Sequence, residues 1–255
     1  MCGIVGYIGK DEAAPFLIDG LRKESYRGYD SSGIVVFGDN VQCAKAVGKL
    51  EELEKKISGL SLKGTVGLGH NRWATHGGVT QKNCHPHADC KQNIFVVHNG
   101  IIENFASLRK KLEEDGHKFV SETDTEVLPH LIEHFFDGNL EEATRKALRL
   151  VRGTYGMVVA SKDDPGKIVA ARFSSPLVLS LNDRGGFVAS DPAAILSHSN
   201  KMIFLADGEI AIIRPGDFFV TDLSSNLKEK EITEIEWTFE EAQKGGYPHF
   251  MQKEI

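Results

Sequence analysis

The sequence predicts an α+β protein in which strands open the chain, helices occupy its middle and strands return at its end. Apolar stretches of strand length alternate with polar connections over the first hundred residues. Stretches with an apolar residue every three or four positions follow between residues 104 and 151, and short strands separated by turns run on from residue 153. Since closely spaced strands pair antiparallel, we expect antiparallel sheets with the helices packed outside them.

The composition is that of an ordinary globular protein. The 255 residues are 41% hydrophobic and 26% charged, and the net charge of −6 includes no basic run, which argues against nucleic acid as a partner. No apolar stretch approaches the ~18 residues that span a bilayer, and there is no secretory signal pattern, so we expect a cytoplasmic protein without membrane contact. The four cysteines are then expected to be reduced thiols.

Each element before residue 103 is predicted from an apolar pattern bounded by turn residues. Residues 26–33 form a small, polar loop, and residues 71–78 begin a connection that runs to about residue 90. The expected strands cover residues 1–9, 34–37, 41–47, 65–70 and 94–98, and the expected helices cover residues 12–25 and 50–57.

The second half contains three expected helices and a run of strands. Thr123 and Glu126 fit a capping box at the start of the second helix. One interpretation of Asp124 is therefore a carboxylate that only stabilises the N-terminus of this helix. We assign residues 1–223 to one domain and residues 224–255 to a polar tail. The helices cover residues 104–115, 121–135 and 140–151, and the strands cover residues 155–161, 167–173, 177–181, 187–190, 202–205 and 210–214.

Cys2 is the first candidate for chemistry. Removal of Met1 would place its thiol beside a free α-amino group, whose ordinary pKa of about 7.7–8.0 lets it accept the thiol proton near neutral pH. The alternative is a small buried hydrophobic side chain, as most free cysteines are. The position of Cys2 alone supports both interpretations equally.

Two further segments carry functional side chains. The connection from residue 71 to about residue 90 is longer than most loops of compact domains, so we expect it to bind a ligand. Asn99-Gly100 stands between apolar runs, which is the strongest short signal for a tight hairpin turn. A turn and a functional role are both open for this pair.

Residues 84–90 place two cysteines and two histidines in a short window, which is suggestive of zinc. The proline between His85 and His87 makes it awkward for both histidines to bind one ion. We therefore expect no metal site and no cofactor in this chain.

Five motifs in order along the chain resemble one family, the class II glutamine amidotransferases, and within it the glutaminase domain of glucosamine-6-phosphate synthases. The resemblance covers essentially the whole chain. It implies the N-terminal-nucleophile hydrolase fold, a four-layer α/β/β/α sandwich with two antiparallel sheets. The motifs are Cys2-Gly3-Ile4, Tyr26-Arg27-Gly28-Tyr29-Asp30-Ser31-Ser32-Gly33, His70-Asn71-Arg72-Trp73-Ala74-Thr75-His76-Gly77, His98-Asn99-Gly100-Ile101-Ile102 and Ser121-Glu122-Thr123-Asp124-Thr125-Glu126.

The resemblance implies three catalytic groups. Cys2 would attack the side-chain amide of L-glutamine to form a thioester and release ammonia. The Asn99 side chain and the Gly100 N–H would stabilise the oxyanion of the tetrahedral intermediate.

The resemblance also implies five residues around the substrate. Arg72 would bind the carboxylate of glutamine, with Thr75 and His76 as further contacts, and Asp124 would bind its ammonium group. Trp73 would close over bound glutamine and gate the passage of ammonia.

For a longer protein, the resemblance implies transfer of ammonia to fructose 6-phosphate in a sugar-isomerase domain that this chain lacks, and a homodimer. Residues 250–255 look like the family's interdomain linker, so we expect a fragment, with a free-standing subunit as the alternative. Two other functions stay open. One is a glutaminase domain that serves another acceptor, as in amidophosphoribosyltransferases or asparagine synthetases, and the other is a non-catalytic module that binds glutamine.

Overall fold

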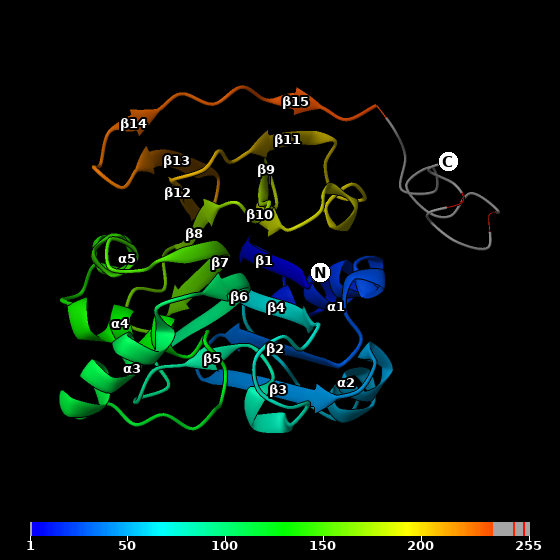
Figure 1. Ribbon diagram of the computed structural model, residues 1–255. Coiled ribbons are helices and arrows are strands. Elements are labelled where there is room, and N and C mark those ends of the chain that lie inside the picture. The colour runs from blue at the N-terminus through cyan, green and yellow to red at the C-terminus, as the bar shows by residue number, and fades with distance from the viewer. Residues whose placement is uncertain (1, 237–246, 248–251, 253–255) are drawn as a thin grey trace.

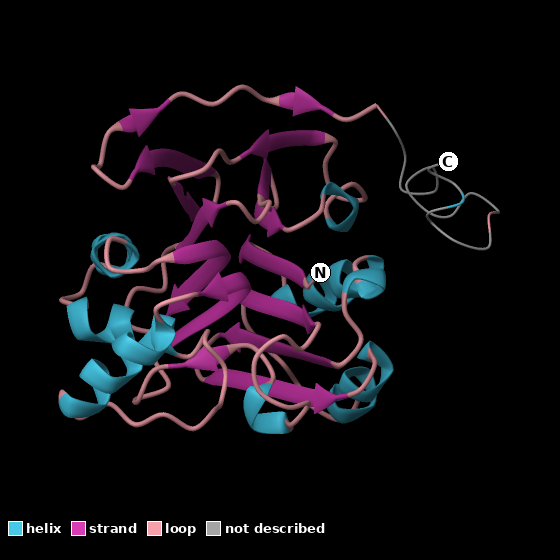
Figure 2. Ribbon diagram, viewed as in Figure 1, coloured by secondary structure: helices cyan, strands magenta, loops and turns pink. Residues whose placement is uncertain are grey.

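Two antiparallel sheets lie face to face at the centre of the structure, a computed structural model that describes residues 2–236, 247 and 252 (Figure 1). The first sheet has the strand order β15-β11-β9-β10-β1-β4-β2-β3, and the second has the order β14-β13-β12-β8-β7-β6-β5. Figure 2 shows the strands stacked in the middle and the helices outside them. This arrangement is the expected four-layer α/β/β/α sandwich.

Most of the longer strands coincide with predicted apolar stretches. The first sheet contains β1 (Gly3–Gly9), β2 (Ser31–Phe37), β3 (Val41–Val47), β4 (Val66–Arg72), β9 (Val178–Asn182), β10 (Gly185–Ala189), β11 (Lys201–Phe204) and β15 (Thr233–Glu234). The second contains β5 (His87–Ala88), β6 (Ile94–Ile102), β7 (Gly153–Ser161), β8 (Ile168–Phe173), β12 (Glu209–Arg214), β13 (Asp217–Asp222) and β14 (Leu227–Lys228).

Helices cover the outer face of each sheet. The first sheet is covered by α1 (Ala13–Lys23) and α2 (Leu50–Ile57), and the second by α3 (Phe105–Glu114), α4 (Val127–Phe135) and α5 (Leu140–Leu148). Short 3₁₀ turns within the described part of the chain lie in connections, namely η1 (Ser25–Arg27), η2 (Gln81–Asn83) and η3 (Pro192–Ala194). Among the described residues, none of the helices combines the length and the apolar character that a membrane crossing requires.

The position of β1 explains why its sequence is continuously apolar. β1 pairs with β4 on one side and with β10 on the other, so it lies inside the first sheet. Since side chains alternate along a strand, Ile4 and Ile8 enter the core between the sheets, whereas Val5 and Tyr7 enter the core beneath α1. Both faces are buried, and the residue before β1 is thereby held in a fixed place.

The end of the chain differs from the prediction in its strands. The expected series stopped at residue 214, yet β13, β14 and β15 follow and pair within the two sheets. Two of these strands lie beyond residue 223, and the domain boundary at that residue stays a prediction. The predicted linker at residues 250–255 falls largely outside the described residues.

Candidate active site

A cavity of about 280 Å³ opens where the start of β1, the end of β4 and the end of β6 meet. These three strand ends come from both sheets, so the cavity lies across the sandwich. Its lining includes every residue to which the sequence assigned a role, namely Cys2, Arg72, Trp73, Thr75, His76, Asn99, Gly100 and Asp124.

Cys2 lies at the cavity, immediately before β1. Its Sγ accepts a hydrogen bond from the backbone N–H of Trp73 at 3.1 Å. Burial raises the pKa of the Cys2 thiol, against the lowering effects of that N–H and of the charges on Arg72 and Arg27. A thiol of raised pKa is mostly protonated near neutral pH, so Cys2 needs a base to become a nucleophile. Met1 lies outside the described residues, and the α-amino base stays a prediction.

Asn99 is held in one orientation by two neighbours. Its Nδ2 donates to the carbonyl oxygen of Cys2 at 2.9 Å, and its Oδ1 lies 3.0 Å from Nε2 of His70. His70 Nε2 also contacts the carbonyl oxygen of His98 at 3.1 Å, and because both partners are acceptors this nitrogen carries the proton. Burial is the main cause that lowers the pKa of His70 to about 3, so the ring stays neutral and continues to donate through Nε2.

Gly100 is part of a strand, and the hairpin turn that was one possibility for Asn99-Gly100 does not form. β6 continues through Ile102, and Gly100 pairs with Tyr155 of β7. The pairing with β7 outweighs the local turn preference. Gly100 has a φ of +129°, and a Cβ at this position would lie 2.1 Å from the carbonyl oxygen of Thr154, so the strand requires glycine here.

Arg72 is the last residue of β4, and the prediction that Asn71 and Arg72 belong to a loop is wrong. Both side chains are buried. The guanidinium of Arg72 donates to the carbonyl oxygens of His76 and, at 3.1 Å, Gly78. Asn71 donates to the carbonyl oxygen of Leu21. Hydrogen bonds therefore compensate the burial of both polar side chains, and the loop after β4 wraps around the Arg72 cation.

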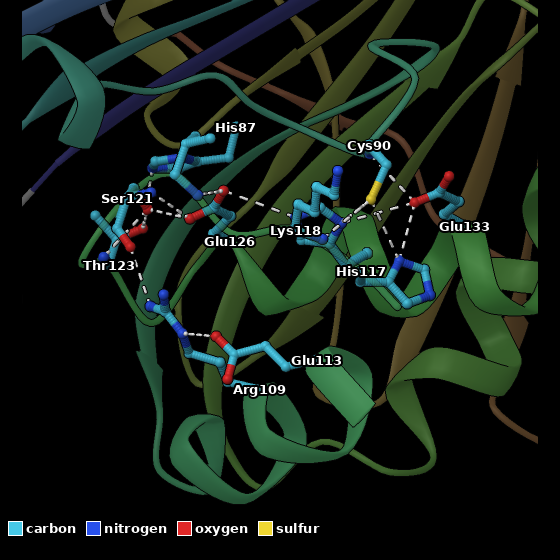
Figure 3. Close-up of polar contacts among 12 residues, drawn as sticks. His87, Cys90, Arg109, Glu113, His117, Lys118, Ser121, Thr123, Glu126 and Glu133 are labelled. Atoms are coloured by element: carbon cyan, nitrogen blue, oxygen red, sulfur yellow. Dashed lines mark hydrogen bonds and ion pairs between the residues drawn. The ribbon is translucent and has the colours of Figure 1, made fainter. Parts of the chain in front are cut away.

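Asp124 lies on the loop before α4, with its side chain 4% exposed. Its Oδ2 accepts the backbone N–H of Ile102 at 2.8 Å, which joins this loop to β6. The predicted capping box is wrong, because the Glu126 carboxylate accepts the N–H of Ser121 instead of that of Thr123 (Figure 3). The carboxylate of Asp124 is therefore presented by a fixed loop.

The loop from Trp73 to His76 forms one wall of the cavity. The Trp73 indole is 45% exposed and contacts the ring of Tyr29 edge to face, with ring centroids 5.5 Å apart. Thr75 is exposed and His76 is half-buried. The backbone of Trp73 contacts the Cys2 thiol, and the role of the exposed indole as a gate stays a prediction.

Several residues around the cavity received no role from the sequence. Nε of Arg27 donates to the carbonyl oxygen of Cys2 at 3.2 Å, and its Nη1 lies 3.0 Å from the carboxylate of Asp191. His70 and His98 are also part of the site. A histidine inside an otherwise apolar strand was the available signal for both of them.

The side chains of residues 84–90 do not converge on one point. Cys84 is buried and donates to the carbonyl oxygen of Thr80, whereas the His85 ring stacks on His70. Cys90 points away, toward residues much later in the chain.

Comparison with known proteins gives matches over the whole chain. Residues 70–197 match the family of glutamine amidotransferase domains. The chain is 49% identical to the glutamine–fructose-6-phosphate aminotransferase (isomerizing) of Methanothermobacter thermautotrophicus and 48% identical to that of Clostridium tetani, in both cases over 100% of this chain. It spans 44% and 42% of those two proteins, less than half of their length.

Solved structures show the same fold. A glutamine phosphoribosylpyrophosphate amidotransferase from B. subtilis superposes with a TM-score of 0.76 at 26% identity, over 89% of this chain and 50% of that one. A glutamine aminotransferase class-II domain protein from Silicibacter pomeroyi superposes with a TM-score of 0.60 over 87% of this chain and 99% of that one. At 18% identity, this second likeness concerns the fold alone.

Proposed function

The chain belongs to the family of glutamine amidotransferase domains, and from this premise we propose that it hydrolyses the side-chain amide of L-glutamine through a thioester on Cys2. One observation carries the proposal, which is that the Cys2 thiol and the Asn99 carboxamide meet at a cavity that also holds a buried cation and a buried anion. Glutamine presents a reactive amide together with a carboxylate and an ammonium group, and this set of side chains matches all three.

The reaction begins with removal of the thiol proton. After loss of Met1, the α-amino group of Cys2 takes this proton, and Sγ forms a bond to the amide carbon of glutamine. The same amino group then protonates the leaving nitrogen, the carbon–nitrogen bond breaks and ammonia departs. Water attacks the thioester, which releases glutamate and restores the thiol.

The developing oxyanion needs donors that are already in place. The Asn99 amide nitrogen carries two N–H groups, and the carbonyl oxygen of Cys2 binds one of them. We assign the second N–H, together with the N–H of Gly100, to the oxyanion. Because His70 fixes the Asn99 amide, this donor needs no reorientation when the charge appears.

We assign substrate recognition to the charged walls of the cavity. Arg72 binds the α-carboxylate, with Thr75 and His76 beside it, and Asp124 binds the α-ammonium group. Trp73 closes over the substrate. A buried charge meets little competition from water, which favours a zwitterion over a neutral amide.

For the longer protein, we propose that the ammonia aminates fructose 6-phosphate in a sugar-isomerase domain. The names of the relatives at 49% and 48% identity support this acceptor more strongly than the 26% identity to a phosphoribosylpyrophosphate amidotransferase supports another. In this proposal residues 1–223 form the glutaminase domain, residues 224–255 lead into the linker, and the full enzyme is a cytoplasmic homodimer. A retained fold that only binds glutamine is the remaining alternative.

Intact mass spectrometry tests the proposal. The mass of the purified chain is measured before and after incubation with the glutamine-like electrophile 6-diazo-5-oxo-norleucine, and glutamate release is assayed in parallel. We expect loss of Met1, one adduct that maps to Cys2, and glutamate production that the adduct abolishes. A processed chain that releases no glutamate, or that carries its adduct only on Cys43, Cys84 or Cys90, would overturn the catalytic assignment.

A further inference from the structure

A cluster of four metal-binding side chains lies on the second sheet's side of the sandwich, apart from the cavity. The side chains of Cys90, His117, His130 and Glu133 each point one donor atom inward, and all four donor atoms lie within 4.8 Å of one another. Figure 3 shows Cys90, His117 and Glu133 turned toward a common point. The sequence pattern predicts no metal in the chain, but that prediction rests on residues 84–90, and three of these four residues lie outside that window.

Local structure explains why the four side chains meet. Cys90 lies in the connection between β5 and β6. His130 and Glu133 are three residues apart on α4, so they share one face of that helix. His117 follows the end of α3, where its N–H bonds to the carbonyl oxygen of Leu112 and the N–H of Gly116 bonds to that of Glu113.

This pair of hydrogen bonds at the end of α3 is a Schellman motif. It requires a left-handed residue, and Gly116 has a φ of +93°. The motif turns the chain back so that His117 faces α4. The position of this glycine thus sets the position of one ligand.

Four of the distances between donor atoms are close to those around a tetrahedral ion. Sγ of Cys90 lies 3.6 Å from Nδ1 of His117 and 3.5 Å from Nδ1 of His130. Oε2 of Glu133 lies 3.1 Å from the first of these nitrogens and 3.7 Å from the second. Zinc bonds of about 2.3 Å to sulfur and about 2.0–2.2 Å to nitrogen and oxygen place the corners of a tetrahedron about 3.3–3.7 Å apart.

We propose that Cys90, His117, His130 and Glu133 bind one zinc-class divalent cation in a closed structural site. A thiolate and two imidazoles select zinc or cobalt over magnesium and calcium, which prefer oxygen ligands. One thiolate and one carboxylate balance the two charges of the ion, and the histidines bind it as neutral rings.

The surroundings of the four ligands are those of a metal site. Sγ of Cys90 accepts the backbone N–H of Lys118 at 3.4 Å. The other nitrogen of the His130 ring, Nε2, has no hydrogen bond among the described residues and faces Oε1 of Glu126 over 3.7 Å, an ion-pair distance, and both side chains are buried. A carboxylate behind a ligating histidine holds the ring in place and increases its basicity.

Glu126 also connects the cluster to the loop that carries Asp124. Its carboxylate accepts hydrogen bonds from the N–H groups of Val120 and Ser121. These two residues lie between Lys118 and the cavity-lining residues Thr123 to Thr125. The bound ion would join the β5–β6 connection, the end of α3 and α4 into one unit. We assign it a structural role, namely to stabilise the base of this loop.

Metal analysis and cobalt substitution test the site. The purified chain should contain about one equivalent of zinc after gel filtration. The chelator-treated chain should bind Co²⁺ with the strong visible bands of tetrahedral cobalt and a thiolate-to-cobalt charge-transfer band. Absence of zinc from the purified chain, together with absence of the cobalt bands, would overturn the proposal.

Matched variants locate the ion. Cys90→Ser should remove the charge-transfer band and His130→Gln should weaken binding, whereas Cys43→Ser, at an exposed thiol outside the cluster, and His134→Gln, on the same helix, should change neither. Glu126→Gln should weaken cobalt binding by about 10–100-fold. If Cys90→Ser keeps the wild-type cobalt spectrum, the assignment is wrong.

Thermal unfolding gives a second measurement of metal binding. Chelation should lower the Tm of the wild-type chain, and added Zn²⁺ should restore it. Cys90→Ser should show no such dependence on Zn²⁺. Equal effects of the chelator on both proteins would contradict the proposed site.

Discussion

The side-chain amide of Asn99 on β6 donates to the carbonyl oxygen of Cys2, the residue that precedes β1, over 2.9 Å. Asn99 belongs to the second sheet and Cys2 leads into the first, so this hydrogen bond crosses the sandwich at the cavity. The relative position of the thiol and the amide therefore depends on how the two sheets pack, through the apolar core that includes Ile4 and Val97.

Replacing Asn99 with Asp keeps the shape of the side chain and removes its donors. We expect kcat for glutamine hydrolysis to fall by about 10²–10³-fold, the usual effect of losing one oxyanion donor, with a smaller change in KM. Steady-state glutaminase kinetics measures both. Asn40→Asp, at an exposed turn between β2 and β3, serves as the control. A kcat within a few-fold of wild type in Asn99→Asp would rule out this role.

Replacing Asp124 with Asn should raise KM for glutamine. An amide can still accept the N–H of Ile102, but it cannot form a charge-assisted hydrogen bond with the ammonium group. Since such bonds contribute about 1.5–3 kcal/mol, we expect KM to rise about 10- to 150-fold. Glutaramate, which lacks the amino group, should discriminate little between wild type and variant. An equal rise in KM for both substrates, or an equal rise in KM for glutamine in Asp39→Asn, would point to a structural effect.

Two glycines with positive φ allow a matched test of backbone strain. A Cβ added to Gly100 would lie 2.1 Å from the carbonyl oxygen of Thr154. A Cβ added to Gly138, whose φ is +100°, would have no such neighbour within 4 Å among the described residues. Alanine in a left-handed conformation costs roughly 1–2 kcal/mol at either site. We expect Gly100→Ala to lower the free energy of unfolding clearly further than Gly138→Ala, as measured by urea denaturation. Equal losses would mean that the strand tolerates the added methyl group.

Acid should destabilise the protein through its buried histidines. Burial lowers the pKa of His70 to about 3 and that of His85 well below its ordinary value. The unfolded chain therefore binds more protons than the folded one below about pH 6.5, and stability falls from there toward pH 3 by up to ~1.4 kcal/mol per pH unit for each histidine.

Glu24 opposes this effect. Burial raises the pKa of its carboxyl well above the ordinary value, so protonation favours the folded state as the pH falls toward about 4.5. Urea unfolding of His85→Gln between pH 7.5 and 5.5 isolates the histidine contribution. The free energy of unfolding of this variant should fall less steeply with decreasing pH than that of the wild type. His134→Gln, at a more exposed position, should show the same change of unfolding free energy with pH as the wild type. Identical slopes in all three proteins would contradict the prediction.

The fold was predictable because local sequence patterns indicate most of its helices and strands. Residues 41–47 are a mostly apolar stretch between turn residues and residues 50–57 follow a helical period, and the structure places β3 and α2 at these bounds. The sequence did not indicate that Asn71 and Asn99 lie in strands, because asparagine prefers loops and turns. Their burial is compensated by partners that are distant in the chain, Leu21 for the first and Cys2 for the second.

The candidate site was predictable only in part, for the same reason. A resemblance assigned roles to residues on separate motifs, and the cavity brings these residues together. No local pattern could indicate that His70 fixes the Asn99 amide, or that Cys90 meets His117 and His130, which lie 27 and 40 residues further on. Such relationships follow from the packing of elements and not from the sequence of any one of them.

The place of β1 has a consequence for how the chain is made. Val5 pairs with Gly69 on one side and with Ala189 on the other. During synthesis the first neighbour emerges early, but the second emerges only after well over a hundred further residues. Until then one edge of β1 stays uncovered, and such edges invite pairing with other nascent chains. We therefore expect folding yield, rather than final stability, to respond most strongly to substitutions in β9 and β10.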